Sequence, residues 1–177
     1  MSEVILYIAA SLDGYIARED GAIDWLSAVD RPDTDYGYAQ FYQSIDVAVM
    51  GRKTYELALS FGEWPYPGKP SCVFTHRNLT SDRSDVTFTS ARPEVVLADL
   101  AARGWERVWL VGGAELVATF QKARLIDEYI VSVIPVILGT GIPLFLSTGV
   151  EQGLELVDSQ RYPSGLVQMT YRPAPTA

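Results

Sequence analysis

The stretch from Val108 to Val117 most constrains the fold, because a strand-like run meets two glycines and continues directly into a helix-like segment. The run up to Val111 is apolar throughout, which is typical of a strand covered on both faces in a parallel sheet. Gly112 and Gly113 then let a ligand approach the backbone, and the helix that follows points free N–H groups outward. The motif therefore predicts an anion site. The alternative is a tight turn whose small residues serve packing alone.

Composition limits the class of protein to which this chain can belong. Its 177 residues, 48% of them hydrophobic and 20% charged, predict one folded domain over 1–177. A net charge of −8 argues against a nucleic-acid or anionic-membrane partner. Cys72 and His76 are the only residues of their types, so we expect no intramolecular disulfide and no Cys- or His-based metal site. No apolar stretch is long enough for a membrane span, and we expect a cytoplasmic protein.

Strand-like and helix-like segments alternate for most of the length. We predict strands at 4–10, 46–50, 71–75, 86–88, 107–111 and 128–133, and helices through 38–42, 55–59, 90–103 and 116–120. The tail reads as a hairpin of strands 154–157 and 166–172, joined by the turn 162–165. This order predicts an α/β fold with a mainly parallel central sheet, flanking helices and an antiparallel C-terminal hairpin.

Unusual residues follow four of the predicted strands. These segments are Ser11–Gly14, Gly51–Thr54, Thr75–Arg77 and Gly112–Gly113. In open α/β sheets, ligands bind outside the carboxyl ends of the strands, so we expect these segments to share one edge. Adjacent basic residues occur in two of them, which suits a ligand with more than one phosphate. The alternative for each arginine is a surface ion pair or solvation of a helix end.

Three ordered motifs resemble the dihydrofolate reductase superfamily. They are Ala9–Ala17, Val49–Tyr55 and Val111–Glu115. Ser11–Gly14 and the later segment Gly139–Phe145 are most similar to the branch that includes the reductase domain of bacterial riboflavin biosynthesis. The resemblance implies a dihydrofolate reductase-like domain that uses NADPH.

The resemblance also implies roles for individual residues. Ala9, Ile16 and Ala17 would line the nicotinamide end. Gly51, Arg52, Lys53 and Thr54 would hold the pyrophosphate and the adenosine side, and Thr75, His76 and Arg77 would surround the ribose and its 2′-phosphate. Gly112, Gly113, Ala114, Glu115 and Leu116 would meet the pyrophosphate at a helix N-terminus. Glu115 departs from the family, whose folate reductases often carry a basic residue there, which leaves Arg52 and Arg77 to select NADPH over NADH.

A catalytic carboxylate is implied by the same resemblance, at the start of the helix that precedes the Met50-Gly51 strand end. Ungapped spacing back from Gly51 reaches Asp35, and Asp24 is a rival. Asp35 also suits a plain helix N-cap. Asp13, Trp25 and Ser132 are the candidate substrate contacts, although Asp13 also suits a structural role in its turn.

Two classes of function remain open from the sequence. The first is an NADPH-dependent reductase of a small heterocycle, either a pterin or a pyrimidine such as the aminouracil of the riboflavin pathway. The second is a nucleotide-binding module without catalysis. Relatives of this branch commonly pair, so we expect a homodimer, with Gly139–Phe145 extending towards the twin subunit.

Overall fold

The apolar run near the N-terminus forms β1 (Glu3–Ser11), a central strand of the main sheet. The structure is a computed structural model that describes residues 2–175. Val4, Ile5 and Leu6 are fully buried in it. A strand that is apolar at consecutive positions needs cover on both faces, and β1 receives that cover from helices on either side of the sheet.

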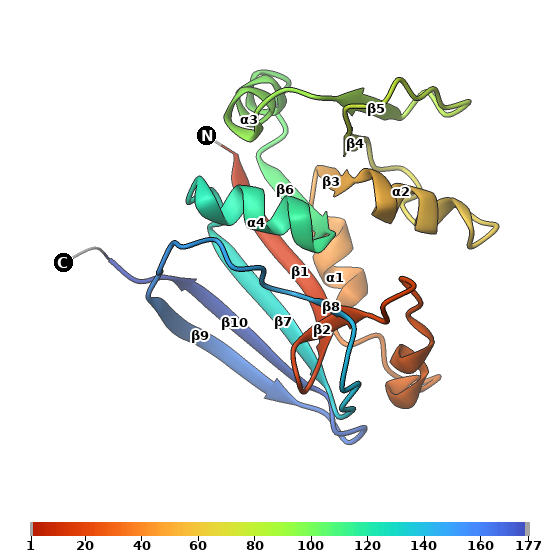
Figure 1. The fold of residues 1–177 in the computed structure, drawn as a ribbon, viewed down its shortest axis with the longest axis vertical. Helices are drawn as coiled ribbons and strands as arrows, with labels where there is room; N and C mark the ends of the chain where they lie inside the picture. Colours follow the sequence, from red (N-terminus) through yellow and green to blue (C-terminus); the bar gives the residue numbers. More distant parts are fainter. Residues whose placement is uncertain (1, 176–177) are drawn as a thin grey trace.

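Eight strands form the main sheet in the order β5-β4-β3-β6-β1-β7-β10-β9. Strands β5 through β7 in that order run parallel, and β10 and β9 close the sheet as an antiparallel hairpin. Their bounds are β3 Val47–Gly51, β4 Ser71–Phe74, β5 Val86–Thr89, β6 Arg107–Gly112, β7 Glu128–Ile134, β9 Leu154–Arg161 and β10 Val167–Pro173. The mainly parallel α/β fold with a C-terminal antiparallel hairpin is thus confirmed (Figure 1).

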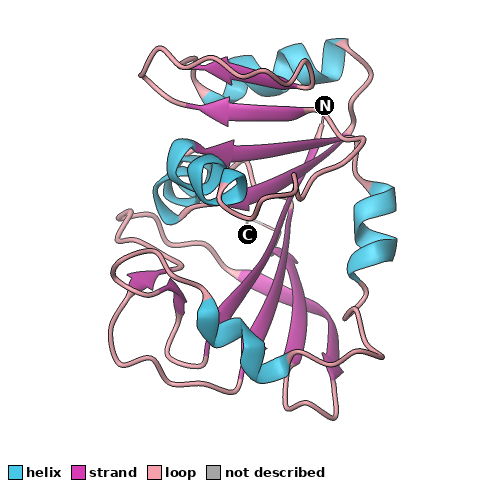
Figure 2. Ribbon diagram, turned by 90° about the vertical axis from the view of Figure 1, so that its right-hand side faces the viewer, coloured by secondary structure: helices cyan, strands magenta, loops and turns pink. Residues whose placement is uncertain are grey.

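Helices cover both faces of this sheet (Figure 2). Helices α3 (Pro93–Ala102) and α4 (Ala114–Lys122) pack on one face, where Phe120 is fully buried. Helices α1 (Tyr38–Ser44) and α2 (Arg52–Leu59) contribute to the core on the other face. Fully burying one large apolar side chain stabilises the fold by about 1.5–3 kcal/mol, so the apolar residues on both faces anchor the helices to the sheet.

Strands β1 and β6 separate partway along their length. Their ladder pairs only Glu3–Leu6 with Arg107–Leu110, although β1 continues to Ser11 and β6 to Gly112. Beyond Leu6, the edge of β1 that faces β6 therefore has no ladder partner. Such a parting leaves a cleft in the middle of the sheet, beside the strand ends at which the sequence predicts ligand binding.

Three details differ from or add to the sequence-based expectations. Helix α3 begins at Pro93 rather than at Ser90, because proline suits the first helical position and disfavours helix in the residue before it. A 3-10 helix, η1 (Asp24–Val29), forms after β2 (Tyr15–Ala17). The short strand β8 (Ile142–Pro143), which lies in the segment expected to contact a twin subunit, pairs with β2 of the same chain.

Residues 2–175 contain no helix that is both long enough and apolar enough to cross a membrane. The same residues bring together no group of three or more His, Cys, Asp or Glu side chains that could hold a metal ion. Cys72 is buried in β4, and burial raises the pKa of its thiol.

Candidate active site

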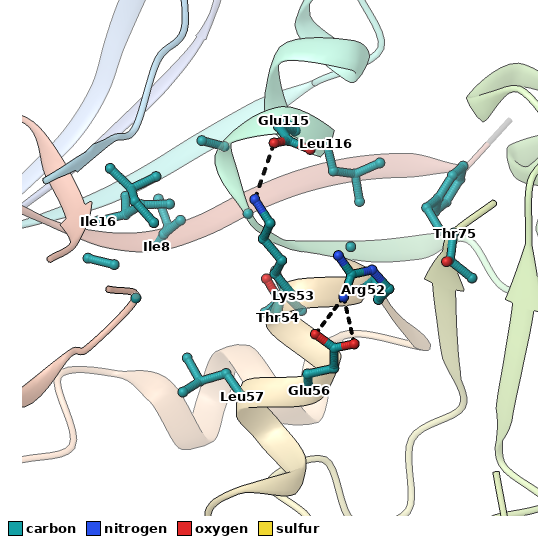
Figure 3. A pocket seen from close by; sticks show the side chains of 18 of the residues that line it. Ile8, Ile16, Arg52, Lys53, Thr54, Glu56, Leu57, Thr75, Glu115 and Leu116 are labelled. Atoms are coloured by element: carbon teal, nitrogen blue, oxygen red, sulfur yellow. Dashed lines mark hydrogen bonds and ion pairs between the residues drawn. The ribbon is translucent and has the colours of Figure 1, made fainter. Parts of the chain in front are cut away.

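A cavity of about 1180 Å³ opens where β1 and β6 part. This volume exceeds the range of about 300–1,000 Å³ that is usual for a small-molecule site, so it has room for more than one small ligand. Its walls come from the ends of β1, β3, β4, β5 and β6, from α2 and α4, and from the segments after β2 and α2. Figure 3 shows Ile8, Ile16 and Leu57 on one side of the cavity and Thr75 on the other, with Arg52 and Lys53 between them.

Two glycine turns meet at the middle of the cavity. A Cβ atom added at Gly51 would lie 3.8 Å from the backbone N of Gly113, and one added at Gly113 would lie 3.5 Å from Thr54 Oγ1. Helices α2 and α4 begin directly after these glycines, and neither has a side-chain N-cap hydrogen bond among the described residues. Two helix N-termini therefore point unused N–H groups at one space, which is the arrangement that binds phosphate.

Two of the cavity's cations are already paired with carboxylates. Arg52 Nη1 donates to both carboxylate oxygens of Glu56, at 2.6 and 2.7 Å. Lys53 Nζ lies 3.5 Å from Glu115 Oε1 across the cavity (Figure 3). Both partners of the second pair are well exposed, so water screens it and it contributes little to stability. The pairings reduce the positive charge that Arg52 and Lys53 offer to a ligand.

The turn after β4 supplies cations that are not paired in this way. Thr75, His76 and Arg77 all line the cavity, and Thr75 Oγ1 accepts a hydrogen bond from the backbone N of Arg77 at 3.0 Å. The turn between β5 and α3 adds Arg92, which the sequence analysis did not identify. Within residues 2–175, neither Arg77 nor Arg92 forms an ion pair. Arg92 could have been found from the sequence because it follows β5, whose carboxyl end lies at the same sheet edge as that of β4.

The opposite end of the cavity is apolar. Ala9, Ile16 and Ala17 lie here, as the resemblance implied for the nicotinamide end. The sequence analysis missed the other members of this wall, which are Tyr7, Ile23, Leu26, Leu57, Phe61, Tyr66, Trp109 and Val111. Only the parting of β1 from β6 brings these separate segments together, so no local pattern could have identified them.

Neither candidate catalytic carboxylate lines the cavity. Both oxygens of Asp24 accept hydrogen bonds from Arg18, at 2.7 and 2.9 Å. Asp35 accepts from the backbone N of Gly37 and Ala39, at 3.0 and 2.9 Å. The N-cap residue of α1 is Gly37, so Asp35 binds N–H groups at the start of this helix without being its N-cap. The hydrogen bond from Arg18 lowers the pKa of Asp24, and those from Ala39 and Gly37 lower the pKa of Asp35. Both groups are therefore ionised near neutral pH and are poor proton donors.

The candidate substrate contacts also lie outside the cavity wall. Asp13 accepts hydrogen bonds from the backbone N of Leu138 and Gly139 and so joins two loops. Trp25 is buried in η1. Ser132 pairs with Ala9 across β1 and β7, one strand away from the cavity.

A polar network connects Ser132 to the cavity. Its hydroxyl accepts a hydrogen bond from Gln168 Nε2 at 3.0 Å, and the same amide nitrogen lies 3.4 Å from the hydroxyl of Tyr7, which lines the cavity.

Gly112 itself does not line the cavity, although its neighbour Gly113 does.

Comparisons with known proteins agree on one family. The family described as the RibD C-terminal domain matches residues 2–168. The uncharacterized protein YwjB of Bacillus subtilis (strain 168) is 41% identical over 170 residues, covering 96% of this chain and 97% of YwjB. A second protein of that organism, uncharacterized protein YyaP, is 30% identical over 182 residues, covering 95% of this chain and 93% of YyaP.

Solved structures agree with this assignment. A protein of Shewanella sp. PV-4, named for riboflavin biosynthesis, matches with a TM-score of 0.90 and 32% identity over 99% of this chain and 100% of its own. The diaminohydroxyphosphoribosylaminopyrimidine deaminase/5-amino-6-(5-phosphoribosylamino)uracil reductase of Thermotoga maritima has a TM-score of 0.75 at 17% identity. That match covers 98% of this chain and 57% of the Thermotoga protein, and it bears on the fold alone.

Proposed function

Because this chain belongs to the RibD C-terminal domain family, we propose that it is an NADPH-dependent reductase of a small heterocycle. The observation that carries the proposal is the convergence of the α2 and α4 N-termini on one elongated cavity. The name of one structural neighbour that is 32% identical to this chain, a riboflavin biosynthesis protein of Shewanella sp. PV-4, supports a reductase of the riboflavin type. A dihydrofolate reductase-like reaction on a pterin is the related possibility.

The residues around the cavity fit a dinucleotide. Gly51–Thr54 and Gly113–Leu116 would hold the pyrophosphate through backbone N–H groups, because helix N-termini favour negative charge. Arg77 and Arg92 would face the 2′-phosphate, with Thr75 and His76 beside the ribose. The apolar end would hold the nicotinamide ring between Ala9, Ile16 and Ala17. When bound, the cofactor supplies the hydride.

The protein's own contribution is to orient the substrate and exclude water. The ring to be reduced would lie against the apolar wall formed by residues such as Leu57 and Trp109, in contact with the nicotinamide position. No carboxylate of Asp24 or Asp35 reaches this wall, so we propose that the proton comes from solvent.

Binding and turnover of NADPH together test this function. We expect NADPH to bind to the isolated protein by calorimetry and its absorbance to decay when a suitable pterin or aminouracil is added. A chain that binds no NADPH would contradict the proposal. A second candidate, a catalytically silent nucleotide-binding module, is favoured by the engagement of Asp24 and Asp35 elsewhere, and it would be supported by tight NADPH binding without turnover of any pterin, aminouracil or quinone.

We also propose that the protein is a homodimer in the cytoplasm. Strand β9 is one of the two edge strands of the sheet, and Leu156 and Val157, which lie at its irregular register with β10, are 56% and 52% exposed. A second copy would cover this apolar surface. Sedimentation analysis should give the mass of a dimer, and a Leu156→Lys variant should shift it towards the monomer. A monomeric wild-type protein would reject this arrangement.

A further inference from the structure

The two ends of the cavity differ in charge. Every basic side chain in its described wall lies just after β3, β4 or β5. Arg52 and Lys53 begin α2 directly after β3, His76 and Arg77 follow β4, and Arg92 follows β5. The opposite end is formed by the outer half of β1, by Trp109 of β6, by Leu57 of α2 and by Phe61 and Tyr66 beyond that helix. If the phosphates and adenosine of the dinucleotide occupy the basic end and its nicotinamide lies at Ala9, Ile16 and Ala17, the substrate has only the remainder of this second end available.

The second end is a rigid aromatic wall. Trp109 and Tyr66 are each 6% exposed, and their rings lie 5.4 Å apart in an edge-on arrangement. Tyr7 stacks on Phe41 with a centroid distance of 4.1 Å. The indole N–H of Trp109 donates to the carbonyl oxygen of Tyr7 at 3.1 Å, so its one polar atom is already engaged. Most of these ring surfaces pack into the core, and the parts that line the cavity form an apolar boundary with no free indole donor.

A phosphate group would have no cationic partner at this end. Lys53 is directed at Glu115, as Figure 3 shows, and Arg18, on the neighbouring loop, is engaged by Asp24 through two hydrogen bonds. Arg18 does not line the cavity. A phosphate moved from water to an apolar wall without a partner loses its hydration and gains nothing in return.

The acidic residues near this end oppose an anion further. Glu19 and Asp20 follow β2 and line the cavity. Glu19 accepts a hydrogen bond from Thr140 Oγ1 at 2.7 Å, and Asp20 accepts from the backbone N of Ala22 at 2.9 Å, but neither forms an ion pair among the described residues. Their negative charge repels a substrate phosphate.

We propose that the substrate of this chain is an uncharged, flat conjugated ring that carries no phosphate group, bound between Leu57, Phe61 and the Tyr7–Trp109 wall. The inference rests on the proposed reductase function and narrows its substrate class to rings without phosphate, such as a pterin. It therefore excludes the phosphoribosylaminouracil after which the Thermotoga maritima protein is named. The ring accepts two electrons as a hydride at an electrophilic carbon or nitrogen and one proton from solvent at the conjugated position. NADPH is oxidised to NADP⁺ in the same step, so charge and atoms balance.

Calorimetry with a matched pair of ligands tests the inference. The probes are 6-hydroxymethylpterin and its phosphate ester, each titrated into the protein saturated with NADP⁺, with menadione as a second neutral ring. We expect the neutral pterin to bind at least about tenfold more tightly than its ester, since desolvating an unpaired charge is costly. Equal or tighter binding of the ester would overturn the inference, as would failure of both neutral rings to bind.

Two variants of α2 sharpen the test. Leu57→Arg places a cation in the apolar end. We expect this variant to bind the neutral pterin more weakly than the wild type does, and to bind its phosphate ester more tightly. Leu59→Arg is the matched control, because Leu59 lies on the same helix, is 51% exposed and does not line the cavity. The control should leave both affinities as in the wild type. An ester that gains nothing in Leu57→Arg counts against this location of the ring.

Failure of the inference and failure of the proposed function give different results. If NADP⁺ and NADPH themselves do not bind, the reductase proposal is wrong, and the proposal about the substrate class is then wrong as well. If they bind and the phosphorylated pterin is preferred, the reductase proposal stands and only the substrate class is wrong.

Discussion

Replacing Arg77 by Gln should weaken the binding of NADPH but leave that of NADH nearly unchanged. Arg77 lines the basic end of the cavity and has no carboxylate partner in residues 2–175, so its full charge would be available to a 2′-phosphate. NADH lacks that phosphate. The variant therefore removes an interaction that only one of the two cofactors makes.

The magnitude follows from the exposure of the site. A hydrogen bond to a charged group contributes about 1.5–3 kcal/mol, and about 1.4 kcal/mol corresponds to a tenfold change in Kd. Arg77 is exposed, so water and salt screen its interaction and the lower end of that range applies. We expect the Kd of NADPH to rise about tenfold in Arg77→Gln at low salt, and by less as the salt concentration increases.

Arg52→Gln is the matched control for this measurement. Arg52 lies on the same edge of the sheet, but Glu56 already shares its charge through two short contacts. Replacing it leaves the negative charge of Glu56 unpaired, so the binding of NADPH and of NADH should weaken by a similar factor. Calorimetric titration of each variant with each cofactor gives the ratio of the two Kd values. If Arg77→Gln raises both Kd values by the same factor, Arg77 does not read the 2′-phosphate and the reasoning is refuted.

Three further predictions concern other parts of the chain. Glu115→Gln should tighten the binding of NADPH and NADH alike, since it removes a carboxylate from the first turn of α4, and unchanged titrations would contradict this. Gly113→Ala should preserve the melting temperature, because the added Cβ would meet Thr54 Oγ1 at an ordinary 3.5 Å, and a large loss of stability would contradict this. The same variant should weaken dinucleotide binding, because the Cβ occupies the space in which the ligand approaches the backbone. Burial, with a smaller effect from Asp127, raises the pKa of Tyr129 to about 12, so the stability that depends on its neutral form is complete below its ordinary pKa of 10.0 and is lost as the pH rises to about 12. Chemical denaturation should therefore show a steeper alkaline loss of stability in the wild type than in Tyr129→Phe, and parallel curves would contradict this.

Local patterns in the sequence were sufficient to predict the fold. The apolar run of β1 and the periodicity of α4 each depend on residues close together in the chain, and both elements form where the sequence predicts them. The positions of the glycine turns after β3 and β6 were also predictable, because in each case an apolar strand runs into glycine and a helix follows at once. A mainly parallel sheet then follows from alternating elements and right-handed connections, which is why the sheet-edge location of the cavity could be expected. The order of the strands in the sheet was not predicted and comes from the structure.

The division of the cavity into a basic and an apolar end depends on contacts between distant segments. Trp109 reads in the sequence as one more core residue of β6, and it becomes a wall of the cavity only because β1 and β6 part beyond Leu6. Asp35 has the expected position in the chain, but its carboxylate accepts hydrogen bonds from the backbone N–H groups of Gly37 and Ala39 at the start of α1. Spacing in the sequence cannot reveal these local hydrogen bonds. Sequence patterns specify which residues share a helix or strand. The direction of a side chain depends instead on the space and the hydrogen-bond partners that the surrounding segments provide in the folded chain.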